Sequence, residues 1–330
     1  MGFLKSLFAP QQPKETKTDA QVSADKQRVA FETLKDSGVR AIKINEYKLA
    51  IGYLCKALEL RPDDREAKAL LAEAYLSAGE MADALAMLRP MADENPGNVN
   101  VWLSIARAEL ELREWDGLLD ASAKAETLAA TNPIVFYYEG MAYSGMEDYD
   151  SAISKFTKAI SLADSYADAY IMRAKAYASQ EKFDEAEKDV DFMIAHDMAD
   201  DYVYMLKGKL RRAHEDYEGA LAAYRKAREL NPFNAEAYIS EGETCELRGD
   251  NAGAMDVYNE ALANMPDSAE VLRVRAALEK KTGAEAAAED DLHKADAATP
   301  QGGAQDGGGE FSQMQNRVED NARRSNPFGF

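Results

Sequence analysis

The chain has 330 residues and a formal net charge of −20 at pH 7. Nonspecific binding to nucleic acid or to an anionic membrane requires clustered lysine and arginine, so this charge argues against both for the body of the chain. Two cysteines, Cys55 and Cys245, are too few for a disulfide scaffold and favour a reducing compartment. We therefore expect a cytoplasmic protein, and no apolar run in the sequence is long enough to cross a bilayer.

We expect residues 1–30 to form a flexible segment. Its first eight residues lack the apolar core of a secretory signal, but Gly2 and Ser6 match the pattern of N-myristoylation. The apolar side chains of residues 1–8 also share one side of a short helix, which predicts an amphipathic tip. Two interpretations stay open: a tip that contacts a membrane, and an ordinary frayed terminus.

From Phe31 to Ser268 the sequence repeats every 34 residues without insertion or deletion. Seven blocks begin at Phe31, Arg65, Val99, Pro133, Ala167, Asp201 and Ala235. The twentieth position of the block holds Ala50, Ala84, Leu118, Ala152, Ala186, Ala220 and Ala254. A fixed period of this length is typical of a solenoid, in which each repeat packs against its neighbours.

Each block contains two stretches with helical spacing. Positions 4, 8 and 11 share one face of a first helix, and positions 20, 24 and 27 share one face of a second. Position 8 is always glycine or alanine, whereas position 24 is large in every block except the third, which has Ser122. Small residues at position 8 let the two helices approach closely, so we expect a pair of packed helices in every block.

This pattern resembles the tetratricopeptide repeat family. The resemblance implies an all-α fold, a right-handed α-solenoid of antiparallel helix pairs, with seven repeats over residues 31–268. It also implies that the outward face of the first helices lines a concave groove.

The C-terminal part changes composition twice. Residues 269–283 keep the pattern with Leu272 and Ala276 and add charged residues, so we expect a polar capping helix that stops at Gly283. Residues 284–330 are predicted to be a low-complexity linker and a tail. Apolar residues near the end of the tail favour a docking peptide, and a disordered tail explains them equally well.

No motif for catalysis, for phosphate binding or for a metal site occurs in the sequence. The three histidines, His196, His214 and His293, are dispersed and are predicted to be surface residues rather than ligands. We therefore expect no enzyme and no cofactor.

Helical geometry places positions 2, 5, 9 and 12 of each first helix opposite the packed face. Position 5 is apolar in five consecutive blocks, and basic residues lie beside it, which predicts an apolar groove with a basic margin. The candidate groove residues are Leu103, Arg107, Tyr137, Met141, Ile171, Lys175, Met205, Lys209, Arg212 and Ile239. The alternative is that position 5 packs against the neighbouring first helix and belongs to the core.

The leading hypothesis is a non-enzymatic scaffold that binds a protein or peptide partner in this groove, as a segment with apolar anchors and some acidic residues. One alternative is a peripheral membrane-associated assembly factor anchored by residues 1–8. Another is a groove that the C-terminal tail itself occupies, which would make the chain autoinhibited. The sequence leaves the identity of the partner and the oligomeric state open.

Overall fold

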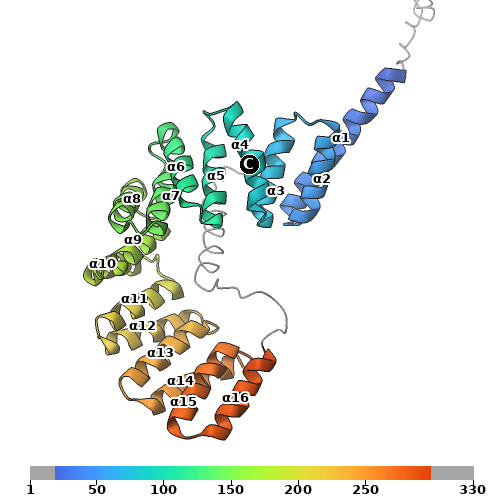
Figure 1. Cartoon of the computed structure of the whole chain (residues 1–330). Helices are drawn as coiled ribbons and strands as arrows, with labels where there is room; N and C mark the ends of the chain where they lie inside the picture. The colour runs from blue at the N-terminus through green and yellow to red at the C-terminus, as the bar shows by residue number, and fades with distance from the viewer. Residues whose placement is uncertain (1–18, 299–330) are drawn as a thin grey trace, which may run out of the picture. The chain divides into compact units, whose positions relative to one another are not determined.

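The computed structural model describes residues 19–298, which form α-helices joined by short loops (Figure 1). The helices of this range are α1 (Asp19–Lys43), α2 (Tyr47–Leu60), α3 (Arg65–Ala78), α4 (Met81–Glu94), α5 (Val99–Leu112), α6 (Trp115–Leu128), α7 (Pro133–Gly145), α8 (Tyr149–Leu162), α9 (Ala167–Ser179), α10 (Phe183–Ala195), α11 (Asp201–Ala213), α12 (Tyr217–Leu230), α13 (Ala235–Leu247), α14 (Asn251–Asn264), α15 (Ala269–Thr282) and α16 (Glu285–Ala298). Consecutive helices pair into hairpins, so the predicted all-α solenoid is confirmed.

The chain divides between Ala130 and Thr131 into two compact units. The N-terminal unit contains the hairpins α1–α2, α3–α4 and α5–α6, and the C-terminal unit contains α7–α8 through α15–α16. Within each unit the second helix of a hairpin contacts the first helix of the next hairpin, as α2 contacts α3 and α8 contacts α9. First helices of neighbouring hairpins also touch, for example α7 with α9 and α13 with α15.

Helix boundaries follow the 34-residue period. Six first helices, from α3 to α13, begin at the first residue of a predicted block, and each second helix begins at its seventeenth residue. A side chain just before most first helices accepts a backbone N–H of the first turn, which replaces a hydrogen bond that the helix cannot make there. The capping residues are Asp64, Asn98, Asn132, Asp200, Asn234 and Ser268.

The fifteenth position of every block has a left-handed backbone conformation, with φ between 58° and 86°. These residues are Asn45, Gly79, Arg113, Glu147, Glu181, Glu215, Gly249 and Gly283. A left-handed residue ends the first helix and turns the chain back into the second. Gly283 therefore stops α15 as predicted, and it also stands where an eighth hairpin would turn.

An eighth hairpin is present in the structure. The prediction of a linker from residue 284 is wrong for residues 285–298, which form α16. Alanine and glutamate favour the helix, and the buried Ala288 and Ala295 hold it against α15. The predicted capping helix is thus the first half of another repeat.

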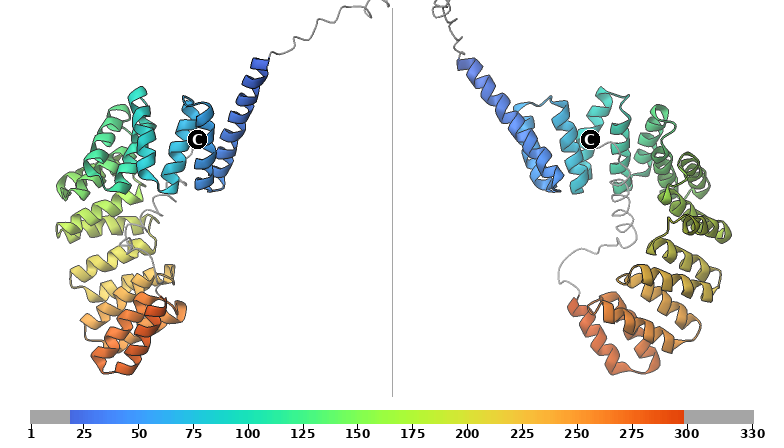
Figure 2. Two further views of the ribbon diagram at one scale, coloured as in Figure 1. Left: turned by 45° about the vertical axis from the view of Figure 1, so that its right-hand side comes forward. Right: turned by 180° about the vertical axis from the view of Figure 1, so that it is seen from behind.

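The first helix also differs from the prediction. Residues 19–30 were expected to be flexible, but α1 starts at Asp19 and extends beyond α2 (Figure 2). No proline or glycine occurs between Asp19 and Lys35, so nothing in the sequence breaks the helix before the first repeat. The predicted membrane tip, residues 1–8, and the predicted docking tail, residues 311–330, lie outside the described residues.

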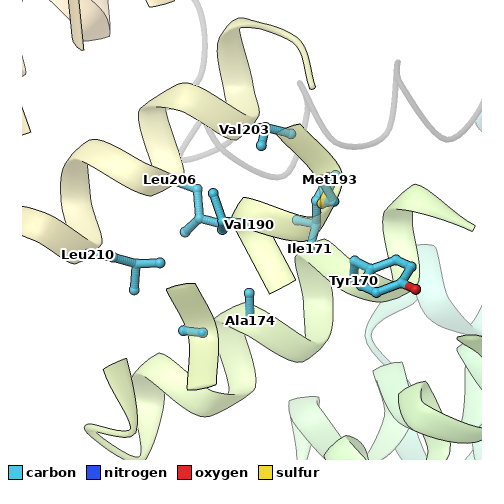
Figure 3. Packing of buried hydrophobic residues seen from close by; sticks show 9 residues of the cluster. Tyr170, Ile171, Ala174, Val190, Met193, Val203, Leu206 and Leu210 are labelled. Carbon is cyan, nitrogen blue, oxygen red and sulfur yellow. The ribbon is translucent and has the colours of Figure 1, made fainter. Parts of the chain in front are cut away.

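Each hydrophobic core joins one hairpin to the next first helix. Figure 3 shows such a cluster, in which side chains of α9, α10 and α11 point toward one another. Its buried residues are Tyr170, Ile171, Ala174, Ala186, Val190, Met193, Val203, Leu206 and Leu210. Because the cluster spans two repeats, one hairpin cannot bury its apolar face alone.

In the fourth, sixth and seventh repeats, an aromatic ring at position 24 requires glycine at position 8. A Cβ on Gly140 would lie 2.5 to 2.9 Å from ring atoms of Phe156, which is too close for van der Waals contact. Gly208 faces Tyr224 and Gly242 faces Tyr258 in the same way. Where position 24 holds the smaller Val190, position 8 holds Ala174, and both are fully buried. The two positions are therefore matched in volume in the fourth to seventh repeats, whereas Leu54 pairs with Gly38 and Leu88 with Ala72 in the first two.

In the third repeat the large and the small residue of the second helix exchange places. Leu118 replaces the usual alanine at position 20 and is fully buried, while Ser122 replaces the usual large residue at position 24. The Ser122 hydroxyl donates a hydrogen bond of 2.6 Å to the carbonyl oxygen of Leu118, so the buried polar group is satisfied.

Tyr224 and Tyr258 pack alike but differ in their hydroxyl groups. The Tyr258 hydroxyl donates to Glu246 at 3.1 Å, whereas the Tyr224 hydroxyl is buried and has no hydrogen-bond partner. We predict that Tyr224→Phe raises the free energy of unfolding by about 1 kcal/mol, because it removes an unsatisfied polar group. Tyr258→Phe should lower it by about the same amount. Thermal unfolding of both variants tests this, and equal shifts of the same sign would contradict it.

Buried ion pairs also link the repeats of the C-terminal unit. Arg173 binds the carboxylate of Asp189 through two hydrogen bonds of 2.9 and 2.5 Å, and it donates a third, of 3.0 Å, to Thr157 in the preceding repeat. Arg275 repeats this arrangement three repeats later, with Asp291 and Asn259. Each arginine therefore ties its own hairpin to the second helix before it.

Candidate functional site

The ten predicted groove residues all lie on first helices. Leu103 and Arg107 belong to α5 in the N-terminal unit, and the other eight belong to α7, α9, α11 and α13 in the C-terminal unit. The four basic residues, Leu103 and Ile239 are half-buried. Tyr137, Met141, Ile171 and Met205 are buried.

The predicted exposed apolar stripe is wrong at the four buried positions. Ile171 belongs to the cluster of Figure 3, and Met205 packs with Tyr224 and other buried residues of α12 and α13. The Tyr137 ring lies 6.0 Å from that of Phe156. Position 5 therefore packs into the core in the fourth, fifth and sixth blocks, as the alternative interpretation held, whereas Leu103 and Ile239 at the same position stay half-buried.

Three of the four basic residues, those of the C-terminal unit, instead form a line of contacts between successive first helices. Lys175 of α9 donates a hydrogen bond of 3.1 Å to the hydroxyl of Tyr202 on α11. Lys209 of α11 lies 2.6 Å from a carboxylate oxygen of Glu236 on α13. Arg212 of α11 lies 3.0 Å from Glu243 on α13. We call the surface formed by Lys175, Tyr202, Lys209, Arg212, Glu236 and Glu243 the first-helix face.

Tyr202 was expected on the groove surface, but the acidic partners in this face were not predicted from the sequence. Glu236 and Tyr202 occupy position 2, which follows position 9 of the preceding block after 27 residues. The signal was present, because Lys175 and Lys209 both stand at position 9. Glutamate at position 2 does not fit the predicted apolar groove with a basic margin, so the sequence pattern did not predict these ion pairs.

Lys175 is the basic residue of this face with a neutral partner. Among the described residues its ammonium contacts the Tyr202 hydroxyl and lies 5.9 Å from the centre of the Tyr202 ring, and no ion pair links it to a carboxylate. Lys209 and Arg212, in contrast, are each paired with a glutamate. The face therefore holds one half-buried ammonium group whose charge is not neutralised by a described carboxylate.

A shallow cavity of about 340 Å³ lies at the α15 end of the face. It is lined by Arg212, Glu243, Glu246, Leu247 and Lys281. Lys281 lies 3.0 Å from Glu246, so the charges of the cavity are largely paired. Leu247 is 62% exposed and gives the cavity an apolar rim.

Tyrosines gather beyond the other end of the face. The Tyr166 ring lies 5.3 Å from that of Tyr137, and Tyr137 also contacts Tyr138. Burial raises the pKa of Tyr166 well above its usual value. Tyr137 and Tyr138 are buried, so these rings belong to the core of the repeat rather than to an exposed surface.

Within residues 19–298 no group of three or more histidine, cysteine or acidic residues is arranged to hold a metal ion. His196, His214 and His293 are exposed, as predicted. Cys245 is buried and Cys55 half-buried, and both are free thiols. Among the described residues no helix is both long enough and apolar enough to span a bilayer.

Comparison with protein families gives a consistent result. Two family models described as tetratricopeptide repeat match residues 41–102, 144–210 and 205–269, which together make up more than half of the chain. No curated protein matches the chain by sequence.

Several solved structures share the fold. A tetratricopeptide repeat protein from Parabacteroides merdae aligns with a TM-score of 0.60 and 16% identity, over 81% of this chain and 98% of that one. PilF of Pseudomonas aeruginosa aligns with a TM-score of 0.52 and 19% identity, over 66% and 99%. The APC/C hetero-tetramer Cut9–Hcn1 aligns with a TM-score of 0.51 and 16% identity, over 86% of this chain but only 54% of that one. Identities this low establish the fold alone.

Proposed function

We propose that this chain, which belongs to the tetratricopeptide repeat family, is a non-enzymatic scaffold whose first-helix face binds a segment of a partner protein. The family supports a role in protein–protein interaction. The finer assignment rests on the line of contacts along α9, α11 and α13, which repeats once per hairpin. A segment of a partner laid along this line would meet a regular series of polar groups.

Lys175 carries the proposal. Its ammonium group is half-buried, and its described partner is the phenol of Tyr202 rather than a carboxylate. A carboxylate from a partner would neutralise this charge and form a charge-assisted hydrogen bond, which is stronger than a neutral one. The Tyr202 contact already orders the lysine side chain, so binding costs less side-chain entropy. We therefore infer that the partner segment presents an acidic residue to Lys175.

The other groups of the face determine what can flank that acidic residue. Glu236 and Glu243 offer carboxylates two helical turns apart along α13, so basic or hydrogen-bonding side chains are expected to follow in the partner. Half-buried Ile239 lies between them on the same helix and offers an apolar contact. The partner segment is thus expected to be of mixed charge rather than uniformly acidic.

Charge reversal at Lys175 tests the assignment. Affinity capture with the full chain, followed by mass spectrometry, identifies partners, and the affinity of a purified partner is then measured for each variant. Lys175→Glu should weaken binding by about tenfold or more, because the new glutamate would repel the acidic residue that the partner places there. Lys175→Arg should bind nearly as the wild type does.

Lys188→Glu provides the matched control, since Lys188 is exposed on the second helix α10 of the same hairpin. Circular dichroism confirms that all three variants are folded. A partner that is lost with Lys188→Glu and kept with Lys175→Glu would place the interaction on the second helices. Membrane contact through residues 1–8 and self-occupancy by residues 311–330 involve residues outside the described range and stay predictions.

A further inference from the structure

A cavity of about 300 Å³ lies in the N-terminal unit, where α4, α5 and α6 meet. Its lining residues come from all three helices: Arg89, Ala92, Asp93, Trp102, Ile105, Glu109, Gly117, Asp120, Ala121 and Lys124. Small residues of α6 make the space. Gly117 and Ala121 occupy positions 19 and 23, where the second repeat has Asp83 and Met87. The sixth repeat also has glycine and alanine at these positions, Gly219 and Ala223, so it is the lining side chains of α4 and α5 that distinguish this cavity.

A buried carboxylate forms one side of the cavity. The Glu109 side chain is only 4% exposed, and one of its oxygens lies 2.7 Å from the guanidinium of Arg89. A Cβ on Gly117 would lie 2.8 to 3.1 Å from the Glu109 carboxyl group, so glycine leaves room for it. Arg89 itself is 64% exposed. The acid is thus fixed in the fold, whereas the cation that neutralises it comes from the solvent side.

An aromatic ring and a second acid form the other side. The Trp102 indole donates a hydrogen bond of 2.9 Å to the carbonyl oxygen of Pro96, which fixes the ring. The ammonium of Lys124 lies 4.5 Å from the centre of that ring and 2.7 Å from the Asp120 carboxylate. The Lys124 side chain is 47% exposed, so its ammonium group is partly hydrated beside the ring. The chain's own lysine therefore shows that this position accepts a cation.

We propose that this cavity binds an arginine side chain of a partner protein, which displaces Lys124 from Trp102. Asp93, Glu109 and Asp120 outnumber Arg89 and Lys124, so the lining is net negative before a ligand enters. The net charge of −20 further attracts a basic partner. The site is independent of the first-helix face, which belongs to the C-terminal unit and is expected to take a carboxylate.

Arginine fits better than lysine for two physical reasons. Its planar guanidinium stacks on an indole and at the same time donates paired hydrogen bonds to a carboxylate such as Asp120. It is also less strongly hydrated than an ammonium group, so it loses less on leaving water. The volume of about 300 Å³ lies at the lower limit for ligand pockets, which suits one long side chain rather than a cofactor.

The test uses the full chain with Trp115→Phe, which leaves Trp102 as its one tryptophan. The probes are blocked Gly-Arg-Gly, the same peptide with neutral citrulline in place of arginine, and blocked Gly-Glu-Gly. Fluorescence and the indole N–H resonance of Trp102 are followed during titration. The arginine peptide should give a saturable change in both signals, and the citrulline peptide should give none.

Two variants at exposed positions sharpen the result. Lys124→Met removes the internal competitor and should raise the affinity for the arginine peptide about two- to fivefold, the range of an exposed cation–π contact. Asp120→Asn should lower it by a similar factor. Lys56→Met is the matched control, because Lys56 occupies the same position of the first repeat.

The outcomes separate the alternatives. Saturation by the glutamate peptide would show an anion site formed by Arg89 and Lys124 and would overturn the proposal. Equal binding of arginine and citrulline peptides, an unchanged affinity in Lys124→Met, or no saturable response in either signal would overturn it as well. Circular dichroism of each variant shows that a loss of binding does not come from unfolding.

Discussion

Gly140→Ala should lower the free energy of unfolding of the C-terminal unit by about 1 to 2 kcal/mol. The new methyl group would lie 2.5 to 2.9 Å from ring atoms of Phe156, which is fully buried and has no room to move away. Overpacking of this kind costs about 1 to 3 kcal/mol, and the better helix propensity of alanine offsets up to about 1 kcal/mol of it. Thermal and chemical denaturation measure the net loss.

Two further variants separate packing from propensity. Gly52→Ala should be stabilising by about 0.5 to 1 kcal/mol, because Gly52 is exposed in α2 and a Cβ there meets nothing within 4 Å. Adding Phe156→Val to Gly140→Ala copies the buried pair Ala174 and Val190 of the next repeat. The double variant should therefore be less destabilised than the sum of the single variants. Strict additivity would contradict the matched-volume interpretation.

Asp189→Ala should be the most destabilising substitution considered, with a loss of about 3 to 5 kcal/mol. It would leave the guanidinium of Arg173, only 15% exposed, without its carboxylate. Breaking a buried pair costs more than the pair contributes, because the remaining charge is neither solvated nor paired. Denaturation of the full chain measures the effect, together with a loss of helical circular dichroism at a lower temperature.

An exposed pair supplies the comparison. Asp290 and Lys294 lie 2.5 Å apart, but both are more than half exposed, so Asp290→Ala should change stability by no more than about 0.5 kcal/mol. Replacing both Arg173 and Asp189 by leucine should recover much of the loss in Asp189→Ala, since no charge stays buried. If Asp189→Ala were as mild as Asp290→Ala, the pair would not be buried in solution.

Most of the fold could be predicted from the 34-residue period, because a repeat of fixed length fixes where the two helices of each hairpin begin and end. Second helices begin at the seventeenth residue of each block, from Tyr47 to Asn251, as the columns predicted. The ends of the solenoid were harder to predict. In α16 the apolar residues at the pattern positions are mostly alanine, and alanine and acidic residues alone do not distinguish a packed helix from a linker.

The candidate site was only partly predictable, because exposure depends on the distance between neighbouring first helices. Ile171 and Lys175 stand one helical turn apart on α9, yet the first is buried and the second half-buried. The residue type at one position of the repeat does not show whether an apolar side chain lines an exposed groove or packs between the helices below it. The cavity near Trp102 was not predicted for a related reason. Its space exists because Gly117 and Ala121 are small residues, and the repeat pattern does not show whether neighbouring side chains fill such a space.

The size match between the two helices of a hairpin determines how this chain can be recombined. Joining a first helix that carries Ala174 to a second helix that carries Tyr224 would bring a methyl group against a ring, where the natural partner of that ring is Gly208. A crossover between these two helices is therefore disfavoured, whereas a crossover in a loop between hairpins keeps each size-matched pair together. Duplication, loss or transplantation of modules in this chain is expected to proceed in whole 34-residue steps.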